Sequence, residues 1–285
     1  MKSALNTERS LAELRFGAIS VRLARLFSLA DELGVQVITF KGLAAALYYP
    51  DPIVREFSDI DIAVKPGQLE TFMRAVRPIT GIHGVDFHSG FRHLDKLSWD
   101  EVYGRSIVTT TEHGPIRTLC REDHFRVLAI HWLNDGGRNR GRLTDLKNLL
   151  DSRHGVFGWE RCLEGISPVR RSWIAACVGI LLREGYEFSE PLPFTQEELS
   201  PPKWFLRALD REVGLPKFRP LYYSLDSPQS FALQLRRRFP PNPIQAAVEG
   251  EVAIGTRLPI WAIFKSLLFR CIGSARKIFG VKFSK

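Results

Sequence analysis

The sequence of 285 residues contains few cysteines and no long hydrophobic run. Its four cysteines, Cys120, Cys162, Cys177 and Cys271, show no C-x-x-C spacing, so neither a zinc site nor a disulfide framework is predicted. The longest apolar stretch in the middle of the chain, residues 173–182, is about half of the ~20 residues that span a bilayer. The N-terminus carries charges where a signal peptide has its apolar run. We therefore expect a cytoplasmic protein.

Several common enzyme motifs are also missing. The sequence has no G-x-x-x-x-G-K-[ST], no G-x-G-x-x-G after a strand, no G-x-S-x-G and no H-E-x-x-H. None of the seven histidines has the spacing to a cysteine or a second histidine that indicates zinc. No RNP, zinc-finger or helix-turn-helix pattern is present, so nucleic acid is not expected as a partner.

The composition is that of a globular chain with an excess of positive charge. Hydrophobic residues make up 45% and charged residues 25%, which excludes collagen-like, low-complexity and wholly disordered chains. Forty Lys and Arg against 31 Asp and Glu leave a net charge of +9. Such a balance indicates an anionic partner, such as a nucleotide, a nucleic acid or an acidic membrane.

Hydrophobic periodicity predicts an α/β (α+β) core with a small mixed sheet, followed by an α-helical domain. The predicted strands are 35–40, 58–64, 85–88, 107–110 and 116–119, with a turn at 112–115. The predicted helices are 8–33, 41–49, 66–77 (with Pro66 in its first turn), 123–134, 143–152, 168–184 and 202–213. The pattern between residues 89 and 104 is poorly defined. We place the core at 1–120 and the helical domain at 121–285.

The clearest local feature is the alternating segment 58–64, Ser-Asp-Ile-Asp-Ile-Ala-Val. Alternate side chains of a strand share a face, so Asp59 and Asp61 point the same way and the isoleucines point the other way. Two acids on one face repel each other, and Mg²⁺ bound by one or two carboxylates and phosphate oxygens is a common compensation. Ordinary acids on a solvent-facing edge strand are the alternative.

Two further features strengthen the first interpretation. Upstream, a predicted strand runs directly into Lys41-Gly42 and a short helix, which would bring backbone N–H groups and a lysine near a phosphate. Downstream, Asp86 in the segment Val-Asp-Phe-His offers a third carboxylate that alternates with apolar neighbours. Taken singly, Lys41 is equally a surface lysine and Gly42 an ordinary turn glycine, but together with three acids on adjacent strands they form a recognisable constellation.

The stretch 40–64, FKGLAAALYYPDPIVREFSDIDIAV, resembles the signature of the uncharacterised nucleotidyltransferases of bacteria, a branch of the polymerase-beta-like superfamily. In that branch a strand runs into a lysine-glycine pair, and a helix, a tyrosine-proline turn, an arginine and an Asp-x-Asp strand follow. The resemblance extends more loosely over residues 35–150. The matching positions here are Lys41-Gly42, Tyr49-Pro50, Arg55, Asp59-Ile60-Asp61, Val85-Asp86-Phe87-His88, Glu122-Asp123, His131 and Asp145.

The resemblance implies two-metal nucleotidyl transfer. Asp59 and Asp61 would hold Mg²⁺, or Mn²⁺, against the triphosphate of an NTP, with ATP the expected one. Asp86 would complete the second metal site and help to deprotonate the acceptor. Phosphate contacts would come from Lys41, Gly42 and Arg55, with His88 as the histidine expected to touch the site.

Some assignments keep alternatives. The segment between Val64 and Asp86 is short for the branch, so Asp95 and Asp100 are alternatives to Asp86 as the third acid. Arg55 is equally interpreted as an ion-pair arginine. A helix-surface ion pair with Arg142 is the alternative for Asp145. His124 and His131, which share a helical face, are interpreted as core or hydrogen-bonded histidines, with a substrate contact as the alternative.

We therefore hypothesise an Mg²⁺-dependent nucleotidyltransferase that moves a nucleoside monophosphate to an unidentified small-molecule, peptide or protein acceptor. The alternative is a catalytically degenerate nucleotide-binding protein, or a basic scaffold at an anionic membrane or nucleic acid. The basic apolar segment 259–280 is expected to dock on its own domain, and peripheral membrane contact is its alternative. The basic, glycine-rich loop 136–142 is interpreted as a solvated, mobile connection, and an anion-binding loop is its alternative.

Overall fold

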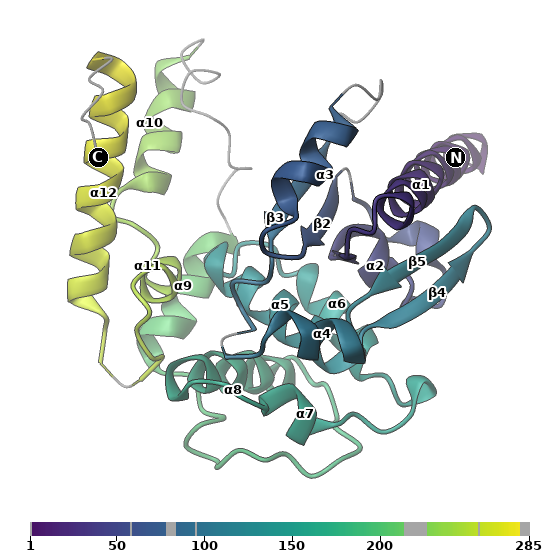
Figure 1. Ribbon diagram of the computed structural model, residues 1–285. Coiled ribbons are helices and arrows are strands. Elements are labelled where there is room, and N and C mark those ends of the chain that lie inside the picture. The colour runs from purple at the N-terminus through teal and green to yellow at the C-terminus, as the bar shows by residue number, and fades with distance from the viewer. Residues whose placement is uncertain are drawn as a thin grey trace. The chain divides into compact units, whose positions relative to one another are not determined.

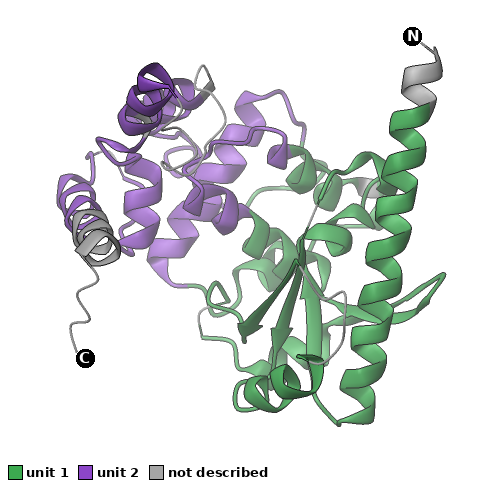
Figure 2. Ribbon diagram, turned by 90° about the horizontal axis from the view of Figure 1, so that it is seen from above, with its two compact units in different colours: residues 1–128, 144–166, 188–192 green, residues 129–143, 167–187, 193–285 purple. Residues whose placement is uncertain are grey.

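A computed structural model describes residues 2–57, 59–77, 84–94, 96–213, 227–255 and 257–279. The chain divides into two compact units (Figure 2). Unit 1 comprises residues 1–128, 144–166 and 188–192, and unit 2 comprises residues 129–143, 167–187 and 193–285. The units are thus interleaved along the chain, and helix α5 (Arg121–Asn134) contains one of the crossing points.

Unit 1 is built on a mixed sheet of five strands in the order β3-β2-β1-β5-β4 (Figure 1). Strand β1 pairs antiparallel with β2 and parallel with β5, β2 pairs parallel with β3, and β4 and β5 form an antiparallel hairpin. The strands are β1 (Val37–Phe40), β2 (Ile60–Val64), β3 (Val85–Ser89), β4 (Ile107–Thr111) and β5 (Gly114–Thr118). The small mixed sheet expected from the sequence is confirmed.

The central strands are buried on both faces, which explains why β1 and β2 are rich in β-branched residues. On one face, Ile60, Ile62 and Val64 pack with Val37 and with an apolar stripe of the long helix α1 (Lys2–Glu32). That stripe consists of Ile19, Leu23, Leu26, Phe27 and Ala30. On the other face, Ile38, Phe40 and Ala63 pack with Leu94, Val102, Leu119 and Val127.

The remaining helices of unit 1 are short. They are α2 (Gly42–Ala46), α3 (Leu69–Val76), α4 (Trp99–Arg105), α6 (Arg142–Leu150), which begins in unit 2, and α7 (Trp159–Leu163), with 3₁₀ turns at Pro52–Val54 and Ser152–His154. Helix α4 begins with a complete capping box, in which Ser98 and Glu101 bond each other's backbone N–H groups.

Unit 2 is helical in the part of the chain that the structure describes. Its further helices are α8 (Pro168–Arg183), α9 (Lys203–Val213), α10 (Pro228–Arg238), α11 (Pro243–Glu249) and α12 (Ile260–Phe279). Residues 173–181 of α8 are all buried, which confirms that this apolar stretch is a core helix. Among the described residues, no helix combines the length and the apolarity that crossing a membrane requires.

Two local predictions were wrong, and one helix was not predicted. Pro66 lies in a turn, and α3 begins only at Leu69, so the proline does not form the first helical turn. The hairpin turn is limited to Glu112 and His113, because Gly114 and Pro115 already pair within β5. Helix α4 lies in the stretch whose pattern was poorly defined.

Candidate functional site

The candidate site lies where β1 ends beside the beginning of β2. Phe40 at the end of β1 is the register partner of Asp61 in β2, and Lys41 follows at once. Asp61 is in turn the register partner of Asp86 in the parallel strand β3. Because register partners point to the same face of a sheet, the carboxylates of Asp61 and Asp86 share one face.

The three predicted acids differ in exposure. Asp61 is only 4% exposed, whereas Asp59 and Asp86 are exposed. Ile60 and Ile62, which alternate with the acids, lie in the core that faces α1, so the alternation predicted for this strand is confirmed. The face that carries Asp61 therefore offers one buried carboxylate and the accessible one of Asp86, and Asp59 is accessible just before the strand.

Two cationic or potentially cationic groups contact the buried carboxylate. The ammonium Nζ of Lys41 lies 2.8 Å from Oδ1 of Asp61, and Nε2 of His88 lies 3.1 Å from the same oxygen. Burial by itself raises the pKa of Asp61, but the hydrogen bond from His88 and the positive charge of Lys41 outweigh it and hold this pKa below its ordinary value. Asp61 is consequently ionised at neutral pH.

The backbone of Lys41 has an unusual conformation, with φ of 59° and ψ of −143°. A non-glycine residue in this region carries strain of about 1–3 kcal/mol, which the surrounding structure must offset. One contact that offsets it is a hydrogen bond from the backbone N–H of Lys41 to Nε2 of His124, at 3.1 Å. His124 is fully buried, and this desolvation lowers its pKa to about 3, so the ring is neutral and Nε2 accepts.

Gly42 is required by a close approach. A Cβ at this position would lie 2.9 Å from the backbone carbonyl oxygen of Asp59, and its φ of 23° is also unfavourable for other residues. The glycine thus allows the start of α2 to pack directly against the strand that carries the acids. This close packing explains why the residue after Lys41 is a glycine.

Arg55 is held by a buried ion pair. Its Nε and Nη2 donate to the two carboxylate oxygens of Asp145 at 2.7 and 2.8 Å, and its Nη1 donates to the carbonyl oxygen of Gly42 at 2.9 Å. The hydroxyl of Tyr49 donates to Asp145 as well, at 2.6 Å. Arg55 and Asp145 therefore join α2 to α6, and the partner of Asp145 is Arg55 rather than Arg142, whose guanidinium pairs with Asp135.

The acids at this site are of the ligand type that a hard divalent cation takes, but the structure does not gather them into a metal site. Asp59, Asp61 and Asp86 present carboxylate oxygens, the ligands that Mg²⁺ prefers. Within the described residues, no group of three or more His, Cys, Asp or Glu side chains is gathered closely enough to hold a metal ion. Instead, the ammonium of Lys41 provides the positive charge beside Asp61.

The structure thus brings Lys41, Asp61 and His88 into direct contact and puts Asp86, Asp59 and Gly42 next to them. Of the alternative third acids, Asp100 pairs with Lys65 just beyond the other end of β2, and Asp95 lies outside the described residues. Asp123, from the later segment of the resemblance, forms a separate buried ion pair with Arg105.

Two further interpretations concern unit 2. His131 is half-buried, so it is not a core residue, and its Nε2 lies 3.7 Å from Oδ2 of Asp135. The arginines of the loop 136–142 are engaged with acidic partners: Arg138 with Glu212, Arg140 with Glu184 and Asp210, and Arg142 with Asp135. Ion pairs therefore anchor the loop that was expected to be a mobile connection.

His124 is the site residue whose role the sequence did not reveal. It was expected to be a core or hydrogen-bonded histidine, and this is confirmed. Its partner, 83 residues away in the chain, was not foreseen. The available signal was a histidine on a predicted helix rich in apolar residues, which indicates a buried ring but not the group that it contacts.

Comparison with known proteins gives one match, which is to a family model. No curated protein and no solved structure matches the chain. The site residues Lys41, Gly42, Arg55, Asp59 and Asp61 all lie within the segment of the chain that a family model recognises. That segment, residues 1–77, matches the model of a family of uncharacterised nucleotidyltransferases.

Proposed function

We propose that this protein is a divalent-metal-dependent nucleotidyltransferase that transfers a nucleoside monophosphate from an NTP, expected to be ATP, to an acceptor hydroxyl. One observation carries the proposal. In the segment that matches the nucleotidyltransferase family, Asp59 and Asp61 lie beside the strained Lys41-Gly42 turn, with Asp86 in register on the neighbouring strand.

In this proposal the carboxylates of Asp59, Asp61 and Asp86 hold Mg²⁺ or Mn²⁺. Such an ion, when bound, neutralises charge on the phosphates and on the departing pyrophosphate. The acceptor oxygen attacks the α-phosphorus, the bond from that phosphorus to the bridging oxygen breaks, and pyrophosphate leaves. Asp86, which is exposed, accepts the proton of the acceptor hydroxyl.

The basic residues have distinct parts in this proposal. Lys41 supplies a phosphate contact when its ammonium exchanges Asp61 for a phosphate oxygen. His88, 40% exposed, remains beside Asp61 and keeps it ionised. Arg55 already has Nε, Nη1 and Nη2 bonded, so we assign it to holding the start of α2, and a phosphate contact would require it to leave Asp145 or Gly42.

The test combines transfer of label from an α-³²P-labelled NTP with thermal unfolding in the presence of each NTP, with and without Mg²⁺ or Mn²⁺. The variants are Asp59→Asn and Asp86→Asn, both at exposed positions whose replacement leaves the core intact. Asp100→Asn is the matched control, because this exposed acid pairs with Lys65 away from the site. We expect each site variant to lose at least about 100-fold in transfer, and the control to match the wild type.

The outcomes separate the competing functions. A metal-dependent rise of the unfolding midpoint with NTP, but no labelled product with any acceptor supplied, would indicate a degenerate nucleotide-binding protein. The Lys41–Asp61 ion pair is the observation that favours this second candidate, because it already satisfies the buried carboxylate. Unchanged midpoints with every NTP, in wild type and variants alike, would contradict both candidates.

A further inference from the structure

Helix α12 docks within unit 2 through small residues. Ala262 and Ser266 are 3% and 5% exposed, and their spacing of four residues puts them on one stripe of the helix. The hydroxyl of Ser266 donates to Glu249 at 2.8 Å, and Ala262 lies against Gly250. The expected docking of this segment is therefore confirmed, and the residues most deeply buried in it are small, while Ile263 and Leu267 are half-buried.

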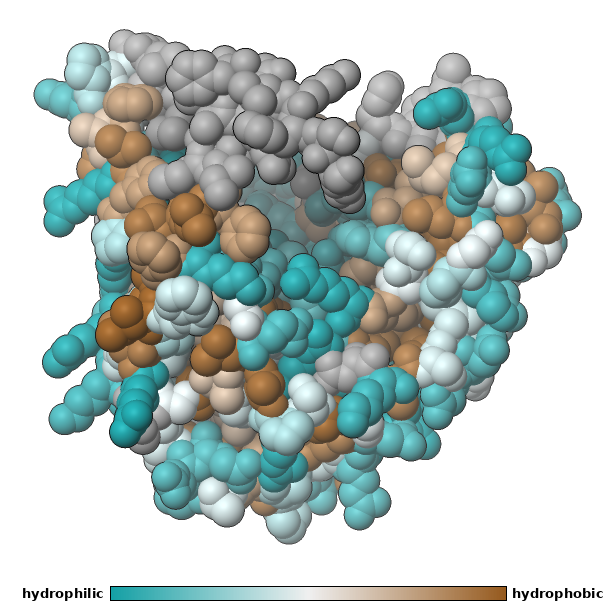
Figure 3. All heavy atoms as spheres, turned by 60° about the vertical axis from the view of Figure 1, so that its left-hand side comes forward, coloured by the Kyte–Doolittle hydropathy of each residue, from teal (hydrophilic) through white to brown (hydrophobic). Residues whose placement is uncertain are grey.

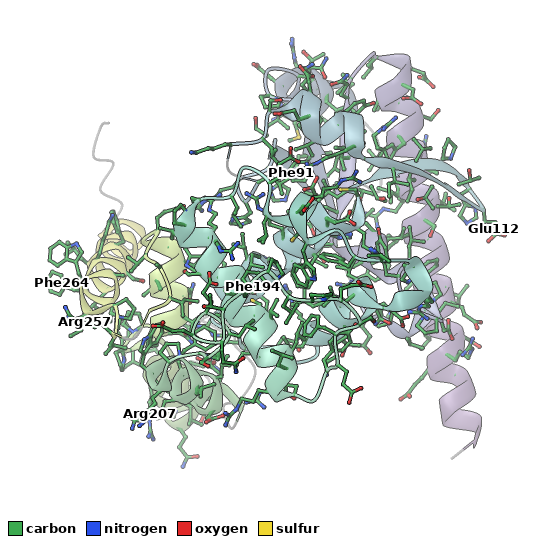
Figure 4. The ribbon with its side chains drawn as sticks, turned by 90° about the horizontal axis from the view of Figure 1, so that it is seen from below. Phe91, Glu112, Phe194, Arg207, Arg257 and Phe264 are labelled. Carbon is green, nitrogen blue, oxygen red and sulfur yellow. The ribbon has the colours of Figure 1, made fainter. Side chains whose placement is uncertain are left out.

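Several bulky apolar residues of α12 are turned outward. Four of them fall within an arc of about 100° around the helix, since successive residues are about 100° apart. We call them the apolar face of α12: Ile260, Trp261, Phe264 and Leu268, which are 70%, 74%, 54% and 50% exposed. The rings of Trp261 and Phe264 stack at 5.9 Å, and Phe264 projects outward from its helix (Figure 4).

Positive charge borders this face, and negative charge is absent from the sequence around it. Lys265 is exposed at the edge of the face, with its ammonium 6.0 Å from the centre of the Phe269 ring, and Arg257 is exposed just before the helix. From residue 257 to residue 285 the sequence contains no Asp or Glu. Its basic residues are Arg257, Lys265, Arg270, Arg276, Lys277, Lys282 and Lys285.

We propose that the apolar face of α12 binds the surface of an anionic lipid bilayer. Exposed Trp, Phe and Leu beside Lys and Arg are typical of helices that lie in the headgroup region. Because the opposite stripe, Ala262 and Ser266, is held by α11 and Glu249, the helix lies along the surface with its aromatic rings toward the acyl chains.

The charge pattern favours lipid over a protein partner. The core of a protein–protein interface is depleted in lysine and other charged residues, whereas Lys265 borders this face and the sequence from residue 257 to 285 contains no acidic residue. Each basic residue near an anionic leaflet adds attraction that falls off within a Debye length. In the view that brings the α12 side of the chain forward, hydrophobic side chains lie openly on the surface among hydrophilic ones (Figure 3).

The first experiment is flotation of the full-length protein with vesicles of phosphatidylcholine alone or with 30% phosphatidylglycerol. We expect binding to the anionic vesicles that weakens with added NaCl. Trp261→Ala combined with Phe264→Ala should bind at least about tenfold more weakly, because two large apolar side chains are lost. Lys265→Gln should bind about fivefold more weakly. Leu14→Ala combined with Val156→Ala is the control, because these residues of unit 1 are equally exposed, at 70% and 73%.

A second experiment does not depend on loss of binding. Trp261→Phe keeps the apolar face, so it should bind the anionic vesicles like the wild type. Brominated lipids quench tryptophan fluorescence, and the variant should lose the part of this quenching that comes from Trp261. Equal quenching in both proteins would overturn the proposal, as would equal flotation of the double alanine variant and the wild type. The proposal would also be overturned if the wild type did not bind anionic vesicles better than vesicles of phosphatidylcholine alone. A dimer in solution that Trp261→Ala with Phe264→Ala abolishes, without any vesicle binding, would assign the face to a second copy of the chain.

Discussion

At the scale of single residues, the candidate site is organised by contacts that balance unfavourable features. Lys41 has a strained backbone, and a neutral histidine accepts its N–H. Asp61 loses hydration by burial, and Lys41 and His88 restore favourable interactions to its charged form. The strain and the buried charge are both concentrated at the residues to which we assign chemistry.

The buried ring of His124 makes folding sensitive to pH. Its pKa is about 3 in the folded chain, against about 6.5 for an ordinary histidine. Between these values the unfolded chain binds a proton that the folded chain does not, so the free energy of unfolding falls as the pH is lowered. The expected loss is up to about 1.4 kcal/mol per pH unit below about pH 6.

Denaturant unfolding at pH 7, 6 and 5 measures this effect. His124→Gln offers an acceptor oxygen to the N–H of Lys41 but does not titrate, so its stability should depend less steeply on pH. His113→Gln, at an exposed position in the hairpin turn, should keep the slope of the wild type. If the stability of His124→Gln falls as steeply with decreasing pH as that of the wild type, the assignment of His124 as a buried, neutral histidine is wrong.

At the scale of secondary-structure elements, the sequence predicted most of what is local. Strand β2, which carries Asp61 and begins just after Asp59, was recognised because its alternation is strict, and Ile60 and Ile62 do face α1. Helix α4 was not predicted, although the pattern of its capping box, Ser98 with Glu101, can be recognised in the sequence. The start of α3 was misplaced because proline suits both a helical first turn and a preceding β-turn.

Contacts between elements could not be predicted in the same way. Arg55 and Asp145 are 90 residues apart, and each had a plausible partner elsewhere: a phosphate for Arg55 and Arg142 for Asp145. A charged side chain does not encode its partner in local spacing, because the pairing depends on how helices pack. The sequence therefore identified these residues without identifying the bond between them.

The ion pair between Arg55 and Asp145 should stabilise unit 1 strongly. Side-chain exposure is 13% for Arg55 and 5% for Asp145, so Asp145→Asn leaves a buried guanidinium without its counter-charge. We expect the free energy of unfolding to fall by about 3–5 kcal/mol. Asp151→Asn is the control, since its ion pair with Arg153 is partly exposed and worth at most about 1 kcal/mol. Similar losses in the two variants, measured by urea unfolding, would refute the assigned role.

At the scale of the whole molecule, the interleaving of the two units is the dominant feature. After residue 128, the chain returns to unit 1 at residues 144–166 and again at 188–192. Its core and candidate site use Val127, His124 and Asp145, all of which follow Cys120. The shift to helical periodicity near Cys120 was visible in the sequence, but periodicity reports the type of element and not the unit to which it belongs.

This arrangement predicts how truncated chains behave. A fragment of residues 1–120 lacks the acceptor for the N–H of Lys41 and the partner of Arg55, so we expect no cooperative thermal transition. A fragment of residues 1–256 keeps every segment of unit 1 and serves as the control, which should unfold cooperatively. Circular dichroism follows both. A sharp transition of the shorter fragment near the midpoint of the full chain would show that residues 1–120 suffice.

The bond between Arg55 and Asp145 also has a consequence in time. During translation Arg55 is made 90 residues before its partner, and at about 5–20 residues per second this corresponds to a delay of roughly 5–18 s. Strands β1, β2 and β3 are all synthesised within that interval or before it, together with Lys41, Asp61 and Asp86. Most of the candidate site is thus made early in synthesis, and it is completed later, when His124 and then Asp145 have followed.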